Sequence, residues 1–107
     1  MMRLDRIDKT ESVLMDVISC VDNTGLEDTS ISGTTVNVSE TGMRVSAGIC
    51  LPVATRVGLR LDFDAHLYRL EGEVRWTNND GEYCAGLAID PTSPDYLAWT
   101  QMFELDL

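Results

Sequence analysis

The sequence predicts a mainly β protein: a small six-stranded antiparallel barrel with one short C-terminal helix. The clearest strand pattern lies in residues 56–63, where apolar side chains alternate strictly with polar ones, as in a strand with one wet face. Short polar turns link this run to other β-rich runs, which is typical of antiparallel neighbours in a barrel. Tyr96, Trp99 and Phe103 follow helical spacing instead and predict one apolar stripe of a helix that covers an open end or face.

Six runs of β-branched, aromatic and alternating residues are expected to form the strands. In chain order these runs are residues 13–21, 30–38, 43–46, 56–63, 67–76 and 83–89. Residues 78–81 (Asn-Asn-Asp-Gly) are the strongest hairpin turn signal. Pro91 ends the last strand, and Ser93 is expected to cap the helix, with Pro94 at its first position.

The chain of 107 residues is expected to form one barrel domain, residues 12–107, preceded by a flexible N-terminal arm, residues 1–11. The arm is polar and charged and has no clear period. No apolar run approaches the ~20 residues that a membrane helix needs, and the N-terminus lacks the apolar segment of a signal peptide. We therefore expect a cytoplasmic protein that does not insert into a membrane.

The net charge of −10 argues against binding to DNA or RNA, because a nucleic-acid-binding protein needs a basic face. Positive charge is concentrated in two places, the arm and residues 41–61. The second segment carries Arg44, Arg56 and Arg60 and no acid. This distribution is compatible with a small anion held locally, whereas a long polyanion would be repelled by the rest of the chain.

The stretch from Asn37 to Gly42 (Asn-Val-Ser-Glu-Thr-Gly) contains a candidate binding surface. Strand alternation predicts that Val36 and Val38 point to one face and Asn37 and Ser39 to the other. Gly42 can adopt a positive φ and allows another group to approach the backbone closely. Two hydrogen-bonding side chains and a glycine would together form a small polar ledge at the end of the strand.

Two other patterns suggest different chemistry. Asp62, Asp64 and His66 alternate and would present three metal ligands on one strand face, but the solvated face of a hairpin explains them more simply. Glu71 and Glu73 are paired carboxylates flanked by arginines, which favours ion pairing over acid–base catalysis. No nucleophile motif accompanies the single histidine. We therefore expect neither enzymatic activity nor a cofactor.

The spacing Asn37-x-Ser39-x-x-Gly42 resembles the second signature of the PilZ family, [Asp/Asn]-x-Ser-x-x-Gly. Members of this family are bacterial receptors for cyclic di-GMP. Further runs resemble the family's paired central strands and its closing strand: residues 58–61, 70–76 and 86–90. The order of elements is similar to that of a PilZ domain from residue 6 to about residue 103, which implies the PilZ-like barrel fold.

The family's first signature, Arg-x-x-x-Arg, lies just ahead of the first strand. Here Arg6 matches the second arginine, Met2 stands at the position of the first, and Arg3 lies beside it. The resemblance implies that Arg6 and Arg3 close on the ligand. A guanidinium suits this role because it donates two parallel hydrogen bonds to a phosphate or to guanine O6 and N7.

The resemblance also assigns roles on the barrel surface. Asn37 and Ser39 would hydrogen-bond the cyclic di-GMP, and Gly42 would permit its close approach. Arg44 is either an additional phosphate contact or an exposed strand arginine. Trp76 matches a position where some members stack an aromatic ring on the ligand, whereas the alternation along its own strand predicts a core tryptophan.

Two functions are compatible with these observations. The first is a cyclic di-GMP receptor, whose arm closes over the barrel and alters a surface read by an unidentified effector protein. The alternative is a degenerate PilZ domain that binds no cyclic di-GMP and acts as a protein–protein interaction adaptor. Met2 in place of arginine favours the adaptor. The intact second signature, together with Arg3 and Arg6, favours the receptor.

Overall fold

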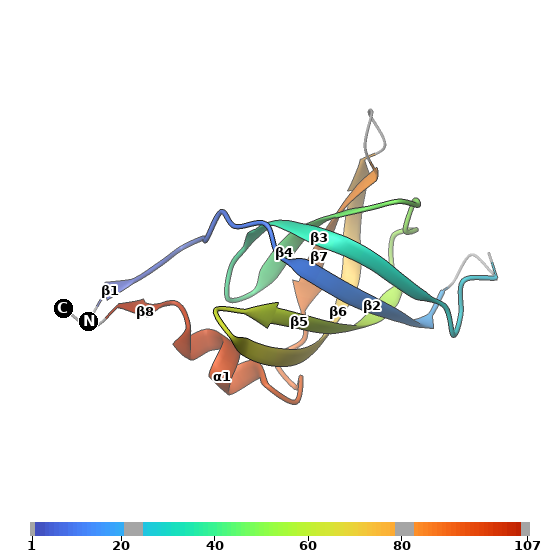
Figure 1. Ribbon diagram of the computed structural model, residues 1–107. Helices are drawn as coiled ribbons and strands as arrows, with labels where there is room; N and C mark the ends of the chain where they lie inside the picture. Colours follow the sequence, from blue (N-terminus) through green and yellow to red (C-terminus); the bar gives the residue numbers. More distant parts are fainter. Residues whose placement is uncertain (1, 21–24, 79–82, 106–107) are drawn as a thin grey trace.

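The protein is described by a computed structural model, which covers residues 2–20, 25–78 and 83–105 (Figure 1). The turn predicted at residues 78–81 lies largely outside the described residues. Among the described residues, no helix has the length and apolar character needed to cross a bilayer.

Six strands close into an antiparallel barrel, which confirms the predicted fold class. Their bounds are β2 (Ser12–Ser19), β3 (Ser30–Val38), β4 (Gly42–Ala47), β5 (Arg56–Phe63), β6 (His66–Asn78) and β7 (Tyr83–Ile89). The strands follow one another around the barrel in the order β2-β3-β4-β7-β6-β5, and the pairing of β2 with β5 closes it. The predicted bounds of β3, β5 and β7 are confirmed.

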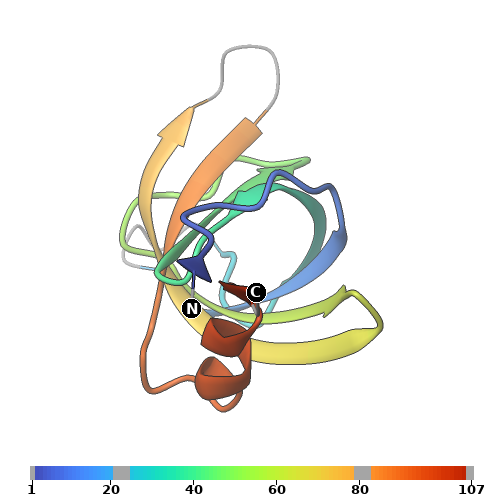
Figure 2. The ribbon, with the colours of Figure 1, turned by 90° about the vertical axis from the view of Figure 1, so that its left-hand side faces the viewer.

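Helix α1 (Tyr96–Gln101) lies at one rim of the barrel, beside the turn between β5 and β6 (Figure 2). Trp99 is fully buried there, and so is Phe103, which follows the end of the helix, whereas Tyr96 is only half-buried. The Trp99 ring packs edge-on against Phe63, Tyr68 and Phe103, with centroid distances of 6.2, 5.4 and 5.4 Å. This aromatic cluster fills the end of the barrel core.

The predicted helix cap at Ser93 is wrong. The helix begins later, and its N-cap residue, Asp95, makes no side-chain capping bond. Ser93 is buried, and its hydroxyl accepts the Glu71 N–H at 2.8 Å and donates to the Asp90 carbonyl at 2.6 Å. The hydroxyl therefore fastens the segment before the helix to β6, a contact that local sequence does not reveal.

The N-terminal arm contacts the rest of the chain along its length, and two of these contacts bracket residues 5–6. Strand β1 (Met2–Arg3) pairs with β8 (Glu104–Leu105), so the two ends of the chain lie side by side (Figure 1). Further along, Ile7 and Val38 of β3 exchange two backbone hydrogen bonds of 2.8 and 2.9 Å. Residues 5–6 span the gap between these anchors, and the flexibility expected of the arm stays a prediction.

Candidate functional site

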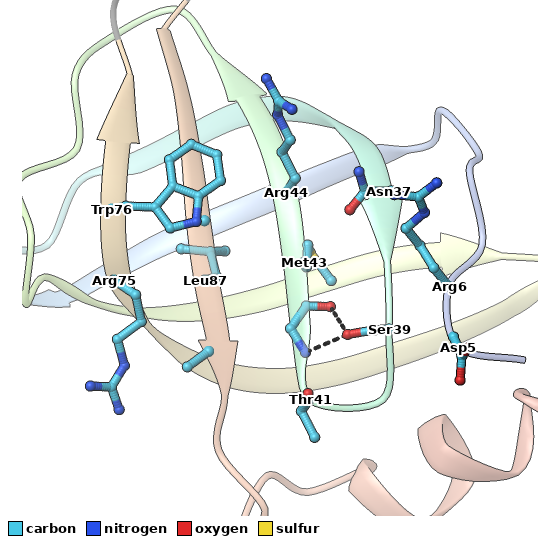
Figure 3. Close-up of a pocket in the computed structure, with 13 residues that line it drawn as sticks. Asp5, Arg6, Asn37, Ser39, Thr41, Met43, Arg44, Arg75, Trp76 and Leu87 are labelled. Atoms are coloured by element: carbon cyan, nitrogen blue, oxygen red, sulfur yellow. Dashed lines mark hydrogen bonds between the residues drawn. The ribbon is translucent and has the colours of Figure 1, made fainter.

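A pocket of about 410 Å³ opens on the outside of the barrel where the arm passes over it (Figure 3). Its lining comes from the arm and from four neighbouring strands, β3, β4, β7 and β6. Six of the seven residues predicted for the ligand site line this pocket: Arg6, Asn37, Ser39, Gly42, Arg44 and Trp76. These six residues come from segments far apart in the chain and lie on one continuous surface, and the binding of a ligand there stays a prediction.

The seventh predicted residue, Arg3, lies in β1. Its backbone pairs with Glu104 of β8. The side chain of Arg3 is outside the described part of the structure, so its contact with a ligand stays a prediction.

A single cross-strand row runs through the pocket. Asn37 of β3 pairs with Arg44 of β4, and Arg44 pairs on its other side with Gly86 of β7. Gly86 in turn pairs with Trp76 of β6. Because cross-strand partners point to the same face of a sheet, these four residues face outward together.

The first end of this row is shaped by a β-bulge in β3. The register with β4 shifts between Thr35 and Asn37, which leaves Val36 as the extra residue. Val36 is 38% exposed while Val38 is fully buried. The prediction that these two valines share one face is therefore wrong, because a bulge interrupts the alternation and redirects the side chains that follow.

The other end of the row is shaped by a second bulge. The register of β6 with β7 shifts between Val74 and Trp76. Val74 is fully buried, whereas Trp76 is 42% exposed. The interpretation of Trp76 as a core residue is thus wrong, because the bulge at Arg75 turns the tryptophan out of the barrel.

Arg44 is the most available cation of the pocket. Its guanidinium lies over the Trp76 ring, with Cζ 5.6 Å from the ring centroid, in a cation–π arrangement. Among the arginine side chains that the structure describes, Arg44 alone has no carboxylate partner. The ion pairs of the others are Arg6–Asp8, Arg56–Asp90, Arg60–Asp16, Arg69–Asp95 and Arg75–Glu73. The five N–H donors of the Arg44 guanidinium can therefore bind an acceptor atom of a ligand.

The arm contributes charges of both signs. The Arg6 Nε lies 3.0 Å from the Asp8 carboxylate, and both side chains are largely exposed. Asp5 also lines the pocket, a residue that the motif comparison missed because the arginine signature leaves that position open. An exposed pair of this kind contributes little stability, so a ligand can compete for the Arg6 guanidinium.

The turn between β3 and β4 is closed by Ser39 and Gly42 (Figure 3). The Ser39 hydroxyl accepts the Gly42 N–H at 3.0 Å, and the Ser39 N–H donates to the Gly42 carbonyl at 2.7 Å. Gly42 does not have a positive φ, although a glycine could adopt one. A Cβ atom there would lie 3.1 Å from the Leu87 carbonyl oxygen, so the close approach at Gly42 is that of β7.

The same turn is tied to the C-terminal helix. The indole Nε1–H of Trp99 donates to the Ser39 carbonyl at 3.1 Å. Trp99 is fully buried and Ser39 half-buried, and the bond between them joins the polar turn directly to α1. No motif predicts this link, because the two residues are 60 positions apart in the chain.

The alternative metal pattern does not converge. Asp62 and His66 are exposed at the turn end of the β5–β6 hairpin, while Asp64 pairs with Lys9 of the arm. Within the described part of the chain, no group of three or more histidine, cysteine or carboxylate side chains is placed to hold a metal ion.

The family comparison agrees with this geometry. The sequence profile of the PilZ domain matches residues 11–101, most of the chain. The chain therefore belongs to the PilZ domain family, whose members are binding and receptor domains. The second signature lies inside the matched span, whereas the arginines of the arm precede it. A search of curated protein sequences finds no match.

Solved PilZ structures share the fold at low sequence identity. The PilZ domain of CeSA from a cellulose-synthesizing bacterium superposes with a TM-score of 0.64 at 16% identity, covering 92% of this chain and 93% of that one. The Bacillus subtilis inhibitor of motility MotI gives 0.65 at 19% identity, covering 92% of this chain and 46% of MotI. The PilZ domain of Escherichia coli YcgR, solved with c-di-GMP, gives 0.64 at 11% identity, covering 90% and 82%.

Proposed function

We propose that this PilZ domain is a receptor for cyclic di-GMP, which binds in the pocket between the arm and strands β3, β4, β7 and β6. One observation carries the proposal: Arg6, Asn37, Arg44 and Trp76 come from four separate segments and line the same pocket. The YcgR domain, which has this fold, was solved with c-di-GMP.

The chemistry of the pocket suits the two phosphates and two guanines of this ligand. Arg44 can donate two parallel hydrogen bonds to a phosphate or to guanine O6 and N7. The exposed Trp76 ring offers a planar face for base stacking. The Asn37 amide has both donors and acceptors, so it can read the polar edge of a base.

The proposed output is a change in the arm. Arg6 would exchange Asp8 for the ligand and draw residues 5–6 onto the barrel between their two anchors. The altered arm surface would then be recognised by an effector protein in the cytoplasm. This receptor mechanism has no catalytic step.

The second candidate is an adaptor that binds a protein partner without the dinucleotide. Met2 at the position of the family's first arginine favours it. The pairing of Arg6 with Asp8 also favours it, because the arm then offers less unpaired positive charge to an anionic ligand.

Calorimetric titration of cyclic di-GMP into the full chain separates the two candidates. The receptor predicts micromolar or tighter binding that is weakened in Arg6→Ala and retained in Arg69→Ala, whose arginine pairs with Asp95 outside the pocket. Absence of binding up to about a millimolar ligand, which corresponds to only ~4 kcal/mol, would reject the receptor in favour of the adaptor.

A further inference from the structure

Gly86 lies at the centre of the pocket row, between Arg44 and Trp76. A Cβ atom built on Gly86 would clash with three atoms of the Trp76 indole, Nε1, Cε2 and Cδ1, the last at 2.7 Å. Side-chain Cβ atoms essentially never approach other atoms within 3.0 Å. The indole therefore occupies the space that any side chain at this position would fill.

The burial of Gly86 and the exposure of Trp76 agree with this contact. Gly86 faces outward in its row yet is buried, because the indole reaches from β6 across β7 and covers it (Figure 3). Trp76 nevertheless stays 42% exposed. One side of the indole thus rests on the glycine backbone, while the rest of the ring remains accessible from the pocket.

The position of the indole also determines its contact with Arg44. The two residues belong to strands that are separated by β7, so they meet only because the ring extends over Gly86. The guanidinium then lies 5.6 Å from the ring centroid. A side chain at position 86 would push the indole off β7 and away from Arg44.

We infer that Gly86 is a positioning residue, which holds the Trp76 indole across β7 beside Arg44 as a stacking platform for a planar purine base. The ligand part of this inference rests on the proposed function. The position of the indole rests on the contacts around Gly86 alone. Pairing of an aromatic ring with a cross-strand glycine also supports the sheet, so the test needs a readout other than stability.

The test compares Gly86→Ala with Gly58→Ala, a strand glycine of β5 where a Cβ atom would meet only ordinary contacts at 3.9 Å. In the ligand-free protein, two-dimensional NMR should show the Trp76 indole N–H resonance, assigned with Trp76→Phe, displaced in Gly86→Ala and unchanged in Gly58→Ala. The Trp99 indole resonance should stay in place in both variants. An unmoved Trp76 resonance in Gly86→Ala overturns the positioning role.

The affinity for cyclic di-GMP supplies the second readout. Gly86→Ala should weaken binding about tenfold, as expected for the loss of one stacked base. Trp76→Ala should weaken binding equally, and the double variant no further, because both changes remove one platform. Independent, additive losses would overturn the inference. Failure of the wild-type protein to bind would instead reject the proposed function, while a displaced indole would still support the positioning role.

A folding defect in Gly86→Ala has its own control. If the added methyl group destabilises the protein by striking the indole, Trp76→Ala in the same chain removes the clash and restores much of the lost stability. Persistence of the defect in the double variant would contradict the contact between the two residues.

Discussion

Two regions of the barrel differ in the regularity of their strands: the β5–β6 hairpin and the pocket surface. The pocket surface is the outer face of β3, β4, β7 and the second half of β6. The hairpin keeps an unbroken register from the Arg56–Glu73 pair to the Phe63–His66 pair. Every second side chain of β5 is buried, and Leu59 is only 1% exposed. Strict alternation thus produces a scaffold with one face in the core.

On the pocket surface, the alternation of buried and exposed side chains is interrupted at two places. Val36 and Trp76 are both exposed where bulges interrupt their strands. The charges differ as well, since Arg60 of β5 pairs with Asp16 at 2.9 Å, whereas Arg44 has only the Trp76 ring within the described residues. Two bulges and an arginine without a carboxylate therefore distinguish the pocket surface from the β5–β6 hairpin.

The largest expected effect concerns the core of the scaffold. Leu59→Ala should lower the free energy of unfolding by about 2–5 kcal/mol, because it leaves a cavity in a closely packed core. Val36→Ala, an apolar truncation in the bulge, should change it by only about 0.5 kcal/mol, because Val36 already lies partly in water. Urea denaturation measures both, and equal losses would show that the bulged valine belongs to the core after all.

The next prediction concerns Trp99, which connects the two regions. Trp99→Phe keeps a ring against Phe63 and Tyr68 of the hairpin but removes the N–H that binds the Ser39 carbonyl. Because the Ser39 carbonyl is only partly buried, loss of this hydrogen bond should lower the free energy of unfolding by about 1.5 kcal/mol. Amide hydrogen exchange should also quicken at Gly42 in the tied turn, and uniform exchange rates in the two proteins would contradict the link.

A smaller effect is expected for the pocket cation. Arg44→Ala should weaken cyclic di-GMP binding about tenfold, since it removes a charge-assisted hydrogen-bond donor, and should leave stability nearly unchanged. Arg44→Lys should recover only part of the affinity, because lysine lacks the planar fork. Arg60→Ala is the matched control on the scaffold, and calorimetry that finds equal losses for Arg44→Ala and Arg60→Ala would remove the distinction between the two surfaces.

The sequence predicts the regular parts of this molecule well. Alternation alone gave the bounds of β5, and helical spacing placed Trp99 on the buried face of α1. The spacing of Asn37, Ser39 and Gly42 grouped three residues that line one pocket. Each of these signals is local, because the side chains that define it lie within a few positions of one another.

The remaining features depend on partners distant in the chain. A bulge is defined by the register with the neighbouring strand, so the residues next to Val36 or Trp76 in the sequence do not predict it. The role of Gly86 emerges only when Trp76 is placed opposite it. Ser93 likewise satisfies a capping pattern locally, yet its hydroxyl bonds to β6 across the fold.

The smallest expected effect tests whether the paired charges of the scaffold contribute to stability at all. The pKa of Asp16 is lowered from its ordinary value, first by the hydrogen bond from the Ser30 hydroxyl and further by the Arg60 guanidinium. The unfolded chain therefore binds this proton more tightly than the folded protein does, so the contribution is present above about pH 5 and is lost as the pH falls through the folded-state pKa.

Because the Asp16 side chain is 41% exposed, its contribution should stay below about 1 kcal/mol. Asp16→Asn should flatten the fall in unfolding free energy between about pH 5 and pH 3, and the exposed Asp62→Asn on β5 serves as the control. Identical pH profiles for Asp16→Asn and the wild-type protein would mean that the Asp16–Arg60 pair adds nothing. In that case Arg44 would differ from the scaffold arginines only in its access to ligand, and not in the energy of its pairing.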